Sequence, residues 1–197
     1  MHKFIIAALL MAVTFAEPAL AHEGNIVRGG FMAGFIHPFF GLDHMLAMIA
    51  VGIWGAILGR PLIYLLPSVF PVMMAVGGVI AMAGIVIPFT ETGIALSLVT
   101  LGGLIAAQRR LPVVAAMIIV GVFAICHGFA HGTELPLAAD PVAYSSGFVI
   151  ATGLLHLAGI GIGWLGGMAR SPALVSLVSG ALIAAAGFYF LAGHVSA

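Results

Sequence analysis

The stretch LPVVAAMIIVGVFAICHGFA, residues 111–130, is an apolar run of the length that a membrane-spanning helix needs, ~20 residues. Five more apolar segments accompany it, at about residues 30–57, 62–88, 93–107, 142–168 and 173–194. The connections between them are short, so six spans use most of the chain after residue 21 and leave no room for a separate soluble domain. The sequence therefore predicts an all-α integral membrane protein with six transmembrane helices in one domain, residues 22–197.

The composition of the 197 residues excludes a soluble globule, because 63% of them are hydrophobic and only 6% are charged. Six lysines and arginines balance six aspartates and glutamates, so there is no basic surface for nucleic acid, and the lipid bilayer is the expected partner. The single cysteine, Cys126, excludes an intrachain disulfide and a thiolate cage for zinc. Eight histidines are the unusual feature, because several lie inside apolar segments where an ionisable group is costly.

The first 21 residues, MHKFIIAALLMAVTFAEPALA, have the pattern of a cleavable N-terminal signal peptide. Lys3 provides the basic start, an apolar stretch follows, and Ala19-Leu20-Ala21 matches a signal-peptidase site. A retained first helix is the alternative, although the apolar stretch is shorter than a span requires. Cleavage would make His22 the N-terminus, where its imidazole and the α-amine could chelate a divalent metal ion. A terminal histidine with no function is the simpler interpretation.

The charged residues alternate between the predicted loops in a way that orients the helices. Arginines occupy the loops after the first, third and fifth spans, whereas acidic residues occupy the loops after the second and fourth. The positive-inside rule places the arginine loops in the cytoplasm, so both mature termini are expected outside. The residues are Arg60, Arg109, Arg110 and Arg170 on the inner side, and Glu91, Glu134 and Asp140 on the outer side, where Arg28 is the one basic exception.

The first predicted span carries the block HPFFGLDH, residues 37–44. On a regular helix His37 and His44 would share one face, and Asp43 would point about 100° away from His44. Pro38 lacks a backbone donor and can kink or interrupt the helix, which would change the direction of Asp43. The block therefore predicts a functional pair of histidines with a nearby acid.

The fourth span ends in a second block, HGFAHGTE, residues 127–134. His127, His131 and Glu134 lie at positions i, i+4 and i+7, which share one face if the helix continues. The glycines of the block leave a second arrangement open, in which Glu134 folds back from the outer loop. The fifth span adds His156, deep in an apolar segment and one turn after Thr152.

The predicted topology brings these polar residues from three spans to compatible depths, in the outer half and the middle of the bilayer. Imidazole and carboxylate ligands together suit Ni²⁺, Co²⁺ and Zn²⁺ better than Mg²⁺ or Ca²⁺. A single histidine such as His156 can instead serve only to hydrogen-bond a neighbouring helix. The candidate metal ligands are His37, Asp43, His44, His127, His131, Glu134 and His156.

The blocks HPFFGLDH at 37–44, HGFAHGTE at 127–134 and ATGLLH at 151–156 resemble the HupE/UreJ family of nickel and cobalt permeases. The first block, with Pro, Gly, Asp and two His at fixed spacing, is the most specific. The resemblance implies uptake of Ni²⁺, or of Co²⁺, by a secondary transporter in the bacterial inner membrane, in support of hydrogenase or urease maturation. It implies a transported metal ion and no permanently bound cofactor. The residues that match the motifs are His37, Asp43, His44, His127, His131 and Glu134.

Two other classes of function are left open by the sequence. An intramembrane hydrolase, metal-dependent or with a serine nucleophile, would use Ser145, Ser146 and His156, but no HExxH motif supports it. A metal-binding membrane scaffold would hold the ion without moving it across the bilayer. No GxxxxGK[ST] motif occurs, so the chain is not expected to hydrolyse ATP. The energy source, the choice of metal and the oligomeric state cannot be predicted from these residues.

Overall fold

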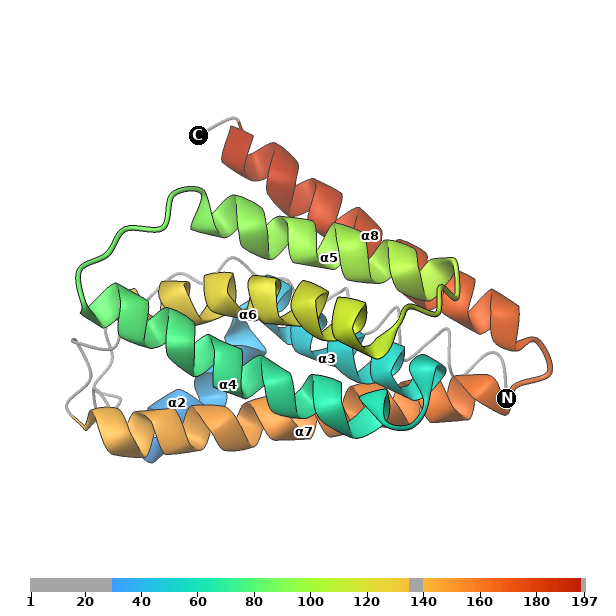
Figure 1. The fold of residues 1–197 in the computed structure, drawn as a ribbon, viewed down its shortest axis with the longest axis horizontal. Coiled ribbons are helices and arrows are strands. Elements are labelled where there is room, and N and C mark those ends of the chain that lie inside the picture. Colours follow the sequence, from blue (N-terminus) through green and yellow to red (C-terminus); the bar gives the residue numbers. More distant parts are fainter. Residues whose placement is uncertain (1–29, 135–139, 196–197) are drawn as a thin grey trace.

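The computed structural model describes residues 30–134 and 140–195 of the chain. In these residues it contains seven helices and no strand, in agreement with the all-α prediction (Figure 1). The predicted signal peptide, residues 1–21, and His22 lie outside the described residues. The helices are α2 (Phe31–Phe40), α3 (Leu42–Leu58), α4 (Leu62–Met82), α5 (Thr90–Ala106), α6 (Val113–Glu134), α7 (Pro141–Gly167) and α8 (Pro172–Val195).

Several of these helices are long and apolar enough to cross a membrane. Within the described residues, α4, α6, α7 and α8 each qualify alone, and the bent pair of α2 and α3 makes a fifth span if it is counted as one. The apolar helix α5 is shorter, with 17 residues. The chain is therefore a multi-pass membrane protein.

The second predicted segment, residues 62–88, is too long at its end. Helix α4 stops at Met82, and residues 83–89 connect it to α5. Gly84 has a positive φ of 74°, which breaks the helical path, and Pro88 cannot donate a backbone hydrogen bond. The predicted segment ran past the end of the helix because residues 83–88 are mostly apolar, and apolar character does not indicate where the backbone turns.

The first predicted segment is two helices and not one regular helix. The axes of α2 and α3 differ by 84°, and Gly41 stands between them with an extended backbone, φ −83° and ψ 98°. Pro38, inside α2, cannot donate to the carbonyl of Gly34 and so weakens the last turn before the break. The alternative that Pro38 interrupts the helix is therefore correct, and the single regular helix is wrong.

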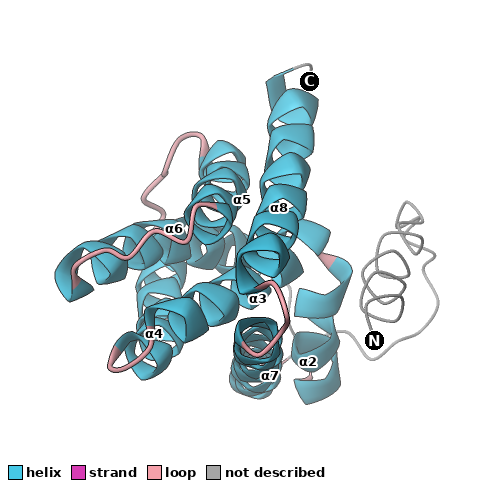
Figure 2. Ribbon diagram, turned by 90° about the vertical axis from the view of Figure 1, so that its right-hand side faces the viewer, coloured by secondary structure: helices cyan, strands magenta, loops and turns pink. Residues whose placement is uncertain are grey.

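Close contacts between glycines and neighbouring backbones join the helices in pairs. In each of four pairs, a glycine on either helix lies very close to a backbone carbonyl of the other helix. A Cβ added at that glycine would come within 3.0 Å of the carbonyl oxygen. Small residues allow this approach in lipid, where no hydrophobic force drives helices together. Figure 2 shows α7 beside α2, and α5 beside α8. The pairs are α2–α7 (Gly34, Gly147), α3–α7 (Gly52, Gly159), α4–α6 (Gly77, Gly128) and α5–α8 (Gly102, Gly180).

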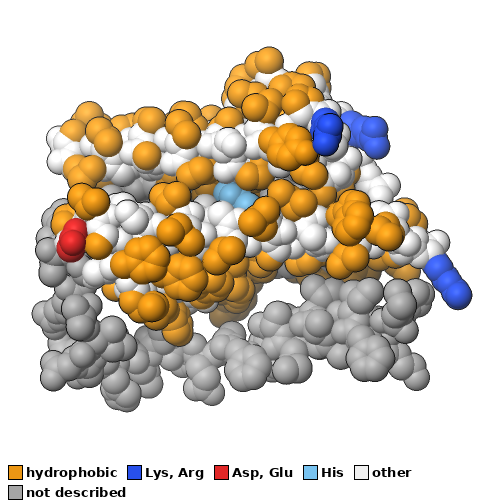
Figure 3. Space-filling view, turned by 90° about the horizontal axis from the view of Figure 1, so that it is seen from below, with side chains coloured by type: hydrophobic (Ala, Val, Ile, Leu, Met, Phe, Trp, Pro, Cys, Tyr) orange, Lys and Arg blue, Asp and Glu red, His pale blue; other side chains and the backbone are white. Residues whose placement is uncertain are grey.

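Apart from Asp43, the charged side chains that the structure describes lie at opposite ends of the molecule. Figure 3 shows basic side chains at one end of the described surface and an acidic one at the other, with apolar side chains between them. The linkers α3–α4, α5–α6 and α7–α8 carry the arginines, and α5 and α7 begin beside Glu91 and Asp140. The two ends are called here the arginine end and the acidic end.

Candidate metal-ion site

Four histidine rings from α2, α3 and α6 lie side by side in the structure. His131 of α6 is central, because its ring centroid is 4.4 Å from that of His44 and 4.9 Å from that of His37. His127, one turn earlier on α6, lies 5.0 Å from His44. The break between α2 and α3 does not separate His37 from His44, because both rings reach His131. The structure thus brings these four residues together, and we call them the outer cluster; their role as metal ligands stays a prediction.

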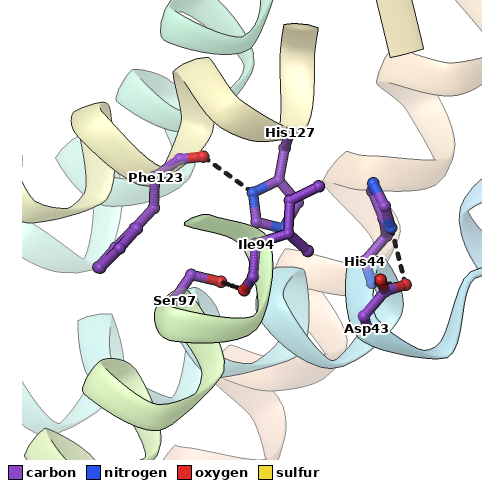
Figure 4. A network of polar contacts seen from close by, with 6 residues as sticks. All are labelled: Asp43, His44, Ile94, Ser97, Phe123 and His127. Atoms are coloured by element: carbon purple, nitrogen blue, oxygen red, sulfur yellow. Dashed lines mark hydrogen bonds and ion pairs between the residues drawn. The ribbon is translucent and has the colours of Figure 1, made fainter. Parts of the chain in front are cut away.

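Asp43 holds the ring of His44 in a fixed orientation. Its Oδ1 accepts a hydrogen bond from the His44 backbone N–H at 2.8 Å and lies 2.8 Å from His44 Nδ1 (Figure 4). An ionised carboxylate only accepts, so Nδ1 donates and the lone pair stays on Nε2. The side chains of Asp43 and His44 are 17% and 12% exposed. The direction expected for Asp43 on a straight helix therefore does not apply, and the structure has the alternative in which the helix is interrupted and Asp43 contacts His44.

His127 has the same arrangement of donor and lone pair. Its Nδ1 lies 2.9 Å from the carbonyl oxygen of Phe123, one turn earlier on α6, and this carbonyl can only accept (Figure 4). The Nε2 atoms of His127 and His44 are both buried and have no hydrogen-bond partner among the described residues. Histidines that bind metal ions commonly donate the second ring nitrogen to a carboxylate or a carbonyl. In both rings the nitrogen left without a hydrogen-bond partner among the described residues is therefore Nε2.

One face of α7 forms a wall beside the outer cluster. The ring of Phe148 lies 4.4 Å from that of His131 and 6.1 Å from that of His37, and Tyr144 lies 6.0 Å from His37. Neither aromatic residue was predicted from the sequence as part of the site. Their spacing in the sequence could have placed them on the same face of α7 as His156. Four buried residues of this helix recur at steps of four: Tyr144, Phe148, Thr152 and His156.

His156 does not join the outer cluster directly. The ring of Phe70 on α4 contacts both, with its centroid 5.4 Å from that of His127 and 5.3 Å from that of His156. Phe70 is buried, and it too was missed from the sequence, because an apolar residue of α4 has no chemical signature. The five imidazoles that the sequence placed at compatible depths are therefore a group of four, with the fifth in contact with Phe70.

One predicted ligand, Glu134, lies at the edge of what the structure describes. Glu134 is the last residue of α6, and its side chain is not described; residues 135–139 follow it. Glu134 therefore stays a prediction from the sequence. Cys126 is partly buried, and its thiol lies so close to Gly93 of α5 that a Cβ there would be 2.7 Å from Sγ. This agrees with a packing role for Cys126.

The described side chains do not converge on one point. No group of three or more of the described His, Cys, Asp and Glu residues has the geometry to hold a metal ion. A hollow of about 460 Å³ lies elsewhere, toward the arginine end between α3, α7 and α8, where Arg110, Gln108 and Trp164 contribute to its lining. Among the described residues the histidines thus form a series of neighbouring rings and not a closed cage.

The alternative of a serine nucleophile gains no support from α7. The Ser146 hydroxyl donates to the Val142 carbonyl of its own helix at 2.8 Å and lies on an exposed face, whereas His156 is buried. Two residues separated in this way do not form a nucleophile and base pair.

The chain is similar to known proteins over a region that includes all of these motifs. The family described as HupE / UreJ protein matches residues 9–190. Protein HupE of Rhizobium leguminosarum bv. viciae is 42% identical over 188 residues, which is 95% of this chain and 97% of that protein. No solved structure matches the chain. The similarity therefore extends over the four histidines of the outer cluster and over the face of α7 that carries His156.

Proposed function

Because the chain belongs to the HupE / UreJ protein family, we propose that it is a permease for Ni²⁺ in the bacterial inner membrane, with Co²⁺ as a second substrate. In this proposal the ion enters from the periplasm and is handed along the outer cluster by His37, Asp43, His44, His127 and His131, with Glu134 at the entrance. The imported ion would serve hydrogenase or urease maturation. The metal ion is substrate, and the protein needs no resident cofactor for this role.

The observation that carries the proposal is the pair of buried Nε2 atoms of His44 and His127. Each ring donates its other nitrogen to an oxygen, and neither Nε2 has a hydrogen-bond partner among the described residues. A buried polar atom that is left unpaired lowers the stability of the fold by about 1–3 kcal/mol, so its presence calls for a function that offsets this cost. Binding of a borderline divalent cation supplies one, since imidazole nitrogen is a preferred ligand of Ni²⁺ and Co²⁺.

The arrangement suits transport more than storage. An ion must replace part of its hydration shell on entry and must still be released, which several weak sites achieve better than one closed cage. The four rings are 4.4–5.0 Å apart along the cluster, so an ion can be shared between successive nitrogens. The Asp43 carboxylate places a negative charge beside His44 and offsets part of the positive charge of the ion.

The direction of entry follows from the two ends of the molecule. We place the arginine end in the cytoplasm by the positive-inside rule and the acidic end in the periplasm. In this proposal the outer cluster opens toward the periplasm and the ion leaves toward the arginine end, where the hollow lies between α3, α7 and α8. In this proposal residues 1–21 are removed, α5 counts as a sixth span, residues 22–197 form one membrane domain, and both mature termini are periplasmic.

The test is uptake of metal ions into proteoliposomes that contain the purified full chain. Ni²⁺, Co²⁺ and Zn²⁺ are compared, each with and without a pH gradient. We expect Ni²⁺ to accumulate inside, and the variant His44→Ala to abolish this while the protein still inserts in the membrane. Binding of Ni²⁺ without accumulation would contradict the permease and support the scaffold. Normal uptake by His44→Ala would contradict the assigned path.

A further inference from the structure

Two buried polar side chains on α7 have no hydrogen-bond partner among the described residues. These are the hydroxyl of Thr152, which is 0% exposed, and both ring nitrogens of His156, which is 1% exposed. The residues are one helical turn apart and therefore share a face. A threonine hydroxyl in a helix often bonds to a carbonyl of the preceding turn, and that of Thr152 does not.

A role in fastening helices does not explain these atoms. The contact of α7 with α3 at this level is made by backbone and glycine, because a Cβ at Gly52 would collide with the His156 carbonyl oxygen and one at Gly159 with the Ile49 carbonyl oxygen. The imidazole contributes no hydrogen bond to that contact. A histidine that only joined two helices would use at least one ring nitrogen to do so.

Phe70 joins His156 to the outer cluster by ring contacts. Its ring is 1% exposed and makes T-shaped contacts with both His127 and His156, with centroids 5.4 Å and 5.3 Å away. The ring has no group that can coordinate a cation or hydrogen-bond to its water. An ion that passes from His127 to His156 along these contacts therefore meets a ring that cannot hold it.

We propose that Thr152 and His156 form a second, inner station for the transported divalent cation, and that the ring of Phe70 closes the passage between this station and the outer cluster. This inference rests on the proposed permease function. Neutral nitrogen and oxygen donors bind the ion weakly, with part of its water retained, which favours release toward the arginine end. The closed ring prevents water and small ions from passing while the outer cluster is empty.

The first experiment separates the inner station from the outer cluster by two measurements on one set of variants. Initial rates of Ni²⁺ uptake into proteoliposomes and equilibrium binding of Ni²⁺ to the detergent-solubilised protein are measured for His156→Gln, Thr152→Val and Thr152→Ser. We expect the uptake rate of His156→Gln to fall about 10-fold to 100-fold and that of Thr152→Val to fall less, with binding at the outer cluster within about twofold of the unchanged protein. Thr152→Ser keeps the hydroxyl and should restore the rate.

Ser146→Ala is the matched control, since its hydroxyl lies on the same helix but is already bonded to Val142. It should leave both measurements unchanged. A rate for His156→Gln equal to that of the unchanged protein contradicts the inner station. Absence of uptake by the unchanged protein contradicts the permease function itself, so the two failures are distinguishable.

The second experiment tests Phe70 without any need for transport. In a Cys126→Ser background, the cysteine introduced by His156→Cys is treated from the outside with a membrane-impermeant thiol reagent, and His37→Cys serves as the accessible reference. We expect the cysteine at position 156 to react at least about tenfold more slowly, and addition of Phe70→Ala to remove most of this difference. Equal reaction at positions 37 and 156 with Phe70 in place contradicts the closing role of the ring.

Discussion

At the scale of single residues, Asp43 acts on His44 before it acts on any ion. Both of its contacts use Oδ1 and both go to His44, so the carboxylate fixes the ring and its tautomer. An asparagine at this position could still accept both hydrogen bonds through its amide oxygen but would carry no charge. Comparison of alanine with asparagine therefore separates orientation from charge.

We expect Asp43→Ala to abolish Ni²⁺ accumulation, because the variant loses the charge and leaves the His44 ring free to rotate. Asp43→Asn should retain partial uptake, lowered about 10-fold to 100-fold, which is the usual effect of weakening a group that orients a metal-binding histidine. Initial uptake rates in proteoliposomes measure both. Equal loss in the two variants would assign the whole effect to the charge and would contradict an orienting role.

Gly41 supplies a second prediction at this scale. Its φ of −83° is open to alanine, but a Cβ there would come 3.2 Å from His44 Nδ1 and 3.4 Å from Asp43 Oδ1. Gly41→Ala should therefore lower the uptake rate about threefold to tenfold by displacing this pair, since small displacements at a site are costly, and should leave the protein folded. Gly30→Ala is the control, because nothing lies within 4 Å of a Cβ at Gly30. Equal uptake by the two variants would show that the pair tolerates the shift.

The histidines could be predicted from the sequence, but the directions of their neighbours could not. Ionisable residues in apolar segments are costly wherever they occur, so His37, His44, His127 and His131 were identifiable without coordinates. The turn of Asp43 toward His44 depends on backbone angles at the break, and these are set by packing between helices. Phe70 differs from other apolar residues of α4 only in its two neighbours, which lie on other helices.

At the scale of helices, the packing of α3 depends on how closely it approaches α7. Gly52 and Gly159 make this approach possible, because each faces a backbone carbonyl of the other helix. The sequence showed glycines at steps of four on α7, which predicts close packing, but it did not identify the partner helix. Gly153, on the same helix, has nothing within 4 Å of a Cβ.

We expect Gly159→Ala to destabilise the protein by about 1–3 kcal/mol, because the added methyl group must push α3 away from α7. The same change at Gly153 should have little effect. The unfolding temperatures of the two detergent-solubilised variants are compared. Unfolding is monitored as the loss of the monodisperse peak on size exclusion. Matching unfolding temperatures for Gly159→Ala and Gly153→Ala would contradict the close approach of the two helices.

At the scale of the whole molecule, helical content and segment order followed from apolar runs, whereas the bend of the first segment did not. Twenty apolar residues predict a helix because lipid offers no hydrogen bonds to an open backbone. The axis change of 84° is compatible with the same run, because polar groups at the break find partners inside the protein: the Gly41 carbonyl accepts from the Met45 N–H, and the His44 N–H donates to Asp43 Oδ1. Pro38 indicated where an interruption was possible, but the direction in which α2 leaves depends on its packing against other helices, mainly α7.

The orientation of the molecule supports the last prediction, because it decides on which side the ion enters. Positive residues resist transfer across the membrane, so the arginine end should be cytoplasmic. In intact cells, in a Cys126→Ser background, a membrane-impermeant maleimide should modify the cysteine introduced by Glu91→Cys and not that introduced by Arg170→Cys. Both positions are exposed, and permeabilised cells should show both modified. The reverse pattern would place the outer cluster nearer the cytoplasm, and the proposed uptake through His37 and His131 would then be export.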